Sequence, residues 1–200
     1  MADSPLRGSP VCAALGVLHV IKLELRNPHW IKGEDDDPED QCAHGHIKFI
    51  IDDLVISDGS EDWTVSAAAL FLLRTIDFDH SKEEPVSESN YLIPCCGFNP
   101  FKTEGNRFDL LLMGCNHGIN PEVIHSNEGI TFRHSGETRT VPKSDWALAV
   151  SKFTNQVLAF YKSSSVKVSV TDKYDREGWQ LFWQELNQRN DMAQKLANLT

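Results

Sequence analysis

The sequence has no run of the roughly 18 consecutive apolar residues that a membrane-spanning helix requires, so we expect no membrane contact. It also has no phosphate-binding glycine loop, no dinucleotide-binding glycine motif, no zinc-protease histidine pair and no hydrolase nucleophile elbow. These absences disfavour nucleotide-driven catalysis and the common hydrolase mechanisms.

Basic side chains are scarce, with 19 Lys and Arg against 29 Asp and Glu, giving a net charge of -10. The imbalance lies in residues 1–100, which carry 18 acidic and 7 basic side chains, whereas residues 101–200 carry 11 and 12. Nucleic acid and anionic membranes are bound by clustered Lys and Arg, so neither is an expected partner. A cationic protein is attracted instead.

Cysteine is also sparse: there are five in 200 residues, an odd number without any C-x-x-C pair. Secreted domains held by disulfides are shorter and richer in cysteine. The sequence therefore predicts reduced thiols and a cytoplasmic location.

Alternating apolar and polar residues predict an α+β fold of one domain, 1–200, with a mostly antiparallel sheet and a loose terminus at 1–10. The clearest hairpin is 46–57, which turns at Asp52 and Asp53 and closes at 58–60. The other expected strands are 15–26, 91–95, 108–113, 122–126, 130–134 and 137–141.

Three helices are predicted. Residues 65–76, capped by Asp62 or Thr64, are apolar nearly all round, which is typical of a buried central helix. A long amphipathic helix follows Ser144 and runs to about 161, and a C-terminal helix spans about 175–197. Residues 163–173 between them are either a linker or a weak strand. The Trp-rich stripe of the last helix is expected to pack on the sheet rather than meet a partner.

Carboxylates cluster at two places in the first half. Residues 34–40 hold six in seven positions, which repel one another and predict an exposed loop that does not pack. A second group lies on the turns of the hairpin. Because binding concentrates on loops, the candidate partner-binding residues are Glu34, Asp35, Asp36, Asp37, Glu39, Asp40, Asp52, Asp53, Asp58, Glu61 and Asp62.

Cysteine and histidine offer an alternative, because they are the ligands that zinc prefers and cysteine is also a nucleophile. Cys42, His44 and His46 alternate along the chain, and Cys115 and His117 have the same one-residue gap. Together with Cys95 or Cys96 they offer enough ligands for one tetrahedral zinc ion. His117, His125 or His134 are the candidate bases for a cysteine nucleophile. Adjacent residues of a strand point to opposite faces, so only one of Cys95 and Cys96 is expected to reach a shared ion. Buried core cysteines are the commoner case, so no metal and no cofactor are predicted.

Five strings, GSEDWTVSAAALFLLRTIDFDH, YLIPCCG, MGCNHGINPEVIH, FTNQVLAFYKSS and EGWQLFWQEL, resemble a group of uncharacterised bacterial proteins. Some of these resemble immunity proteins of polymorphic or contact-dependent toxin systems, over about residues 45–190. The resemblance implies a bacterial protein that neutralises a cognate toxin by direct contact, without a catalytic site. The acidic first half agrees with this, because a basic toxin domain would be attracted to it. A small cysteine- or zinc-dependent enzyme centred on Cys95, Cys96 and Cys115 is the alternative hypothesis.

Overall fold

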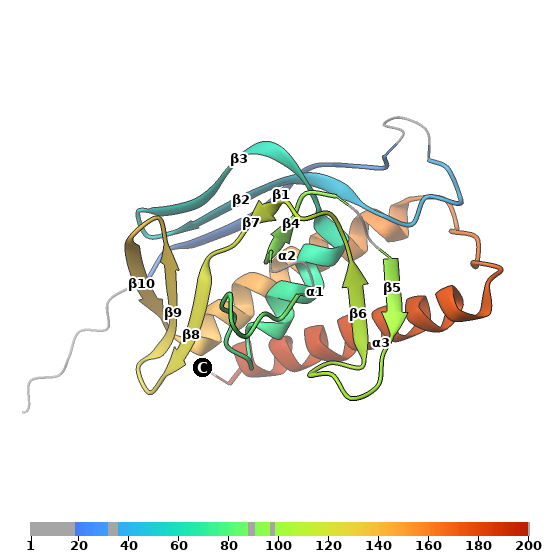
Figure 1. The fold of residues 1–200 in the computed structure, drawn as a ribbon. Coiled ribbons are helices and arrows are strands. Elements are labelled where there is room, and N and C mark those ends of the chain that lie inside the picture. The colour runs from blue at the N-terminus through green and yellow to red at the C-terminus, as the bar shows by residue number, and fades with distance from the viewer. Residues whose placement is uncertain (1–18, 32–35, 88–90, 97–98, 200) are drawn as a thin grey trace, which may run out of the picture.

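The computed structural model describes residues 19–31, 36–87, 91–96 and 99–199. Within them the chain forms three helices and antiparallel strand pairs, which confirms the α+β class (Figure 1). The strands are β1 Ile21–His29, β2 His44–Ile51, β3 Leu54–Thr64, β4 Ile93–Pro94, β5 Asn99–Lys102, β6 Leu110–Met113, β7 Gly118–Ile119, β8 Glu122–Ser126, β9 Gly129–His134 and β10 Glu137–Val141. The helices are α1 Val65–Arg74, α2 Lys143–Ser163 and α3 Lys173–Ala197. In this described part of the chain, no helix combines the length and apolarity that crossing a bilayer requires.

The first three strands form a sheet in the order β1-β2-β3. In β2 the alternate residues Ile47, Phe49 and Ile51 are fully buried, as period-two patterning predicts. The turn at 52–53 is confirmed. The predicted end of the hairpin at 58–60 is wrong, because β3 continues past Gly59 through register shifts and reaches Thr64.

Helix α1 is the centre of the molecule, as its apolar sequence predicts (Figure 1). All of its residues are buried, including the terminal Arg74, and it contacts β2, β3, β4, α2 and α3. Thr64 occupies the N-cap position, but its side chain makes no capping hydrogen bond. A helix buried on every side gains its stability from packing rather than from local propensity.

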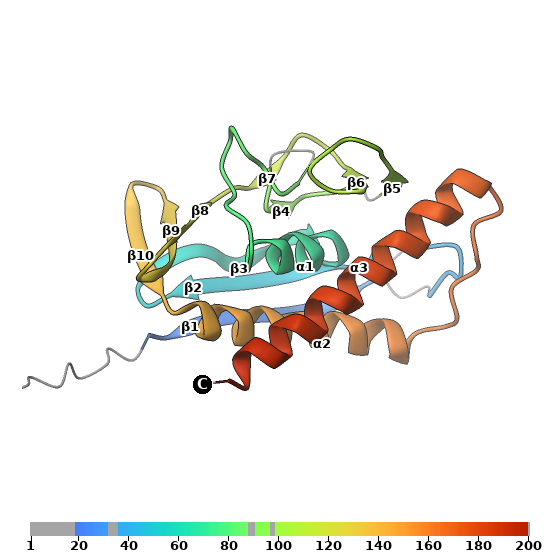
Figure 2. The ribbon, with the colours of Figure 1, turned by 90° about the horizontal axis from the view of Figure 1, so that it is seen from below.

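Helix α2 packs on β1 and on α1, and α3 crosses over α2 (Figure 2). The expected cap at Ser144 is wrong by two positions, because Pro142 precedes the first helical residue. Helix α3 starts at Lys173, two residues before the predicted 175, because Asp172 caps it by accepting hydrogen bonds from the backbone of Tyr174 and Asp175. Its apolar stripe packs inward, with Phe182 fully buried, so the stripe belongs to the core as predicted. The expected surface is wrong, because α3 packs on α2, α1 and the β5–β6 pair rather than on a three-stranded sheet. Residues 164–172 form no strand.

The predicted sheet is divided. The meander over β8, β9 and β10 is confirmed, but it forms a second three-stranded sheet of its own. The expected strands 91–95 and 108–113 shrink to β4 and β6, and each pairs with a short strand absent from the prediction: β4 with β7 and β6 with β5. This division brings residues 95–96 beside residues 115–117.

Candidate functional site

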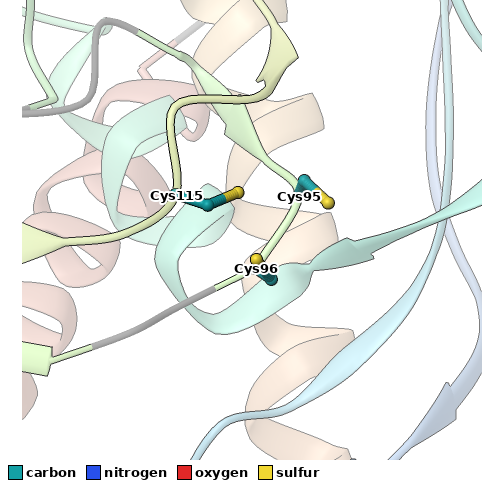
Figure 3. Close-up of side chains that lie close together, drawn as sticks. All are labelled: Cys95, Cys96 and Cys115. Carbon is teal, nitrogen blue, oxygen red and sulfur yellow. The ribbon is translucent and has the colours of Figure 1, made fainter.

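Three cysteines converge where β4 and β7 meet. Cys95 and Cys96 follow β4 directly, and Cys115 lies between β6 and β7. Their Sγ atoms all lie within 4.8 Å of one another. Figure 3 shows the side chain of Cys115 reaching from its own segment toward the segment of Cys95 and Cys96. We call these three residues the thiol cluster.

Backbone pairing holds the two segments together. Pro94 pairs with Gly118 in the β4–β7 ladder. Beyond the ladder, the Cys95 N–H donates to the His117 carbonyl at 2.9 Å, and the Cys115 N–H donates to the Cys96 carbonyl at 2.9 Å. The positions of the thiols are therefore set by main-chain hydrogen bonds rather than by flexible side chains.

Gly118 makes the close approach possible. A Cβ at this position would collide with the Ile93 carbonyl oxygen and would crowd the Tyr91 side chain. Only glycine lets two backbones approach so closely. Gly118, three residues after Cys115, is thus part of what assembles the cluster.

The prediction that only one of Cys95 and Cys96 can reach a shared ion is wrong. It applied the alternation of side chains along a strand, but β4 ends at Pro94 and the chain bends at Cys95 and Cys96. The prediction of buried core thiols is also wrong for the cluster: Cys96 is exposed, and Cys95 and Cys115 are half-buried.

The three thiols differ in acidity. The pKa of Cys115 is lowered, first by a hydrogen bond from the Cys96 thiol. That same bond, together with partial desolvation, raises the pKa of Cys96 to about 11. Desolvation and the neighbouring Cys115 raise the pKa of Cys95. Cys115 is therefore the thiol of the cluster that ionises first.

Two residues of β3, Thr64 and Trp63, lie beside the segments that carry the cluster. The Thr64 hydroxyl donates to the Cys95 carbonyl at 3.4 Å. The Trp63 ring lies 6.4 Å from the ring of His117, and the Trp63 indole N–H is buried without an acceptor among the described residues. A buried donor without a partner is costly in a folded protein, and it lies next to the segment that carries the thiols.

The histidines predicted from the sequence do not join the thiols. Within the described residues, the cluster is the only group of three or more potential metal ligands, so Cys42, His44 and His46 are not assembled into a site. The Nδ1 atom of His44 instead contacts the Cys42 carbonyl at 3.0 Å. His125 is held by Asp79 at 2.7 Å, and burial lowers the pKa of His134.

The acidic candidates fall at two places. Glu34 and Asp35 lie outside the described residues. The expectation that 34–40 does not pack is wrong for Asp36, which bonds Lys167 at 2.6 Å, and for Asp40, which accepts the Ile31 N–H at 2.7 Å. Asp37 accepts the N–H of Glu39 at 2.9 Å.

The hairpin carboxylates are mostly paired within the chain. Asp52 contacts His19 at 3.1 Å, Asp53 contacts Arg139 at 2.6 Å, and Asp62 contacts His29 at 3.2 Å. Asp58 bonds the hydroxyl and N–H of Ser60, and Glu61 is exposed. Of the candidate carboxylates, Asp36 and Asp53 are thus paired with a lysine and an arginine of the same chain.

Comparisons with protein-family models, with curated proteins and with solved structures find no match for this chain. The case for a function therefore comes from the geometry of the site alone.

Proposed function

We propose that the protein binds a zinc ion through Cys95, Cys96 and Cys115 and that this zinc site is its functional centre. The supporting observation is the 4.8 Å limit on the distances between the three Sγ atoms. A tetrahedral zinc ion with Zn–S bonds of about 2.3 Å separates its sulfur ligands by about 3.8 Å, so shifts of about 1 Å or less complete the geometry.

The ligand chemistry favours a thiophilic ion. All three donors are sulfur, which selects zinc or a softer ion such as Cu(I) over Mg²⁺ or Ca²⁺. Ionised thiolates this close repel one another, and a bound cation removes that repulsion. The site requires reduced thiols, which agrees with a cytoplasmic location.

Zinc titration of the reduced full-length chain against a chromophoric chelator tests the proposal. We expect a single equivalent to bind, and Cys95→Ser, Cys96→Ser and Cys115→Ser each to weaken binding by more than about 100-fold, because loss of even an outer-shell group costs 10–100-fold. Cys42→Ser is the matched control and keeps the wild-type affinity. Absence of zinc binding, or equal loss in Cys42→Ser, contradicts the proposal.

A second candidate is the toxin-neutralising protein of the immunity type, which binds a basic toxin domain by charge complementarity. It is favoured by Asp58, Glu61 and Asp62, which are exposed on β3, an outer strand of the first sheet. Opposite charges accelerate association in a salt-dependent way. Pull-down with native mass spectrometry should identify a basic protein partner. The association rate of that partner, measured separately, should be higher for wild type than for Asp58→Asn/Glu61→Gln. An unchanged association rate argues against it.

A further inference from the structure

The thiol cluster supplies three ligands, whereas zinc in proteins takes four. Within the described residues, no other Cys, His, Asp or Glu places a ligand atom within 4.8 Å of all three sulfurs. His117 and Asp62 lie near the cluster, and the contacts of their side chains are with Trp63 and His29.

His117 contributes its backbone rather than its ring to the cluster. Its carbonyl accepts the Cys95 N–H at 2.9 Å and the Cys115 thiol at 3.7 Å. The side chain is exposed, and its ring lies beside Trp63, with the centroids 6.4 Å apart. The Asp62 carboxylate contacts Nε2 of His29 at 3.2 Å.

The cluster also reaches the surface. Cys96 is exposed, and Cys95 and Cys115 are half-buried, so an ion held between them is accessible from solvent. Structural zinc sites are closed by four protein ligands, whereas catalytic sites keep one position open. The structure thus has the features of an open site.

We infer that the fourth coordination position is open and binds an external thiol; this inference rests on the proposed zinc site. Zinc with three thiolates carries a net charge of -1, so it polarises a bound water less than zinc held by three neutral histidines does. A soft sulfur ligand suits the sulfur-rich ion better than water. On binding, the Zn–O bond to water breaks, a Zn–S bond forms, and the thiol proton passes to solvent.

Cobalt substitution tests the inference, because Co²⁺ occupies zinc sites and reports its ligands by absorption. Full-length reduced protein is loaded with Co²⁺ under nitrogen, desalted, and titrated with ethanethiol, with ethanol as the isosteric control. We expect thiolate-to-cobalt charge-transfer absorption to rise by about one third as four sulfur ligands replace three. Ethanol should leave the spectrum unchanged, and cobalt should stay with the protein after a second desalting.

The outcomes separate the two proposals. If the cobalt-loaded protein shows no thiolate-to-cobalt absorption before ethanethiol is added, the zinc site itself is refuted. A cobalt–thiolate spectrum that does not respond to ethanethiol leaves the metal site standing and overturns the open position. His117→Ala identifies the reason: if this variant responds where wild type does not, His117 is the fourth ligand. Loss of cobalt to the thiol also overturns the inference, because it makes ethanethiol a competitor for the metal rather than a ligand.

Discussion

Arg74, at the end of α1, is completely buried and is held by both carboxylate oxygens of Glu185 on α3, at 2.9 and 2.8 Å. Its remaining donors reach the carbonyls of Val86 and Leu110, each at 2.9 Å, and its guanidinium lies 3.9 Å from the centre of the Phe108 ring. One side chain therefore fixes the central helix against α3 and β6. The chain runs from β6 directly into the segment that carries Cys115.

Removing the charge of Glu185 should destabilise the protein strongly. Glu185→Gln leaves the Arg74 guanidinium buried without its counter-charge, and breaking a buried pair in this way costs about 3–5 kcal/mol. Urea unfolding followed by tryptophan fluorescence measures the loss. Glu177→Gln, which removes an exposed pair with Lys102, is the control and should change stability little. Equal stability of the two variants would contradict a structural role for the buried pair.

The same pair should make stability depend on acid pH. Burial raises the pKa of Glu185, but the hydrogen bond and charge of Arg74 outweigh it, so the pKa is lowered overall. The stabilisation is thus present above the unfolded-state pKa of about 4.3 and is lost as pH falls below it. The free-energy difference between wild type and Glu185→Gln should be constant near neutral pH and narrow below about pH 4. If the free-energy difference between the two proteins widened as the pH fell, it would contradict a lowered pKa of Glu185 in the folded state.

Gly118→Ala should disrupt the thiol cluster. The new Cβ meets the Ile93 carbonyl oxygen and forces β7 away from β4. We expect a loss of about 1–3 kcal/mol in stability, as overpacking typically costs, together with weaker zinc binding. Gly178→Ala is matched to it, because its Cβ would collide with the Pro100 carbonyl oxygen where α3 meets β5. That variant should lose stability while retaining its zinc affinity, as measured by chelator competition.

Thiol reactivity should follow the pKa order of the metal-free protein. Cys115 should react first with a disulfide reagent at neutral pH, because the hydrogen bond from Cys96 lowers its pKa and the thiolate is the reactive form. Cys42 should react slowly, because burial raises its pKa to about 12. Stopped-flow absorbance should show a fast phase that disappears in Cys115→Ser and persists in Cys42→Ser.

Zinc should then protect the cluster and leave the reaction rates of the other cysteines unchanged. A coordinated thiolate is withheld from the reagent, so one equivalent of zinc should remove the phases of Cys95, Cys96 and Cys115 together. Counting modified cysteines by mass spectrometry, with and without zinc, checks this. Protection of a single thiol would contradict three-sulfur coordination.

Local sequence patterns predicted the elements whose stability is local or whose burial is complete. The apolar run of α1, the hairpin turn at Asp52 and Asp53 and the β8–β10 meander follow from periodicity and turn chemistry. The short strands β5 and β7 were missed because two to four residues carry no period of their own. Their pairing comes from neighbours that are remote in the chain.

The candidate site was predicted only in part. Sequence reasoning named Cys95, Cys96 and Cys115 but separated the first two by the strand rule, which fails once β4 ends at Pro94. It also assigned the carboxylates to a free acidic surface, although Lys167 pairs with Asp36 and Arg139 pairs with Asp53, each from more than 80 residues away. Such pairings are invisible to local patterns.

By itself, the sequence determined the α+β composition, the burial of α1 and the inward face of α3, because hydrophobic periodicity fixes which side of an element leaves water. Only the tertiary structure decided which cysteines lie together. Gly118 allows β7 to lie against β4, and that contact brings Cys115 to Cys95 and Cys96 across 18 intervening residues. The thiol cluster exists because two short backbone segments pair, and that pairing depends on the packing of the whole chain around them.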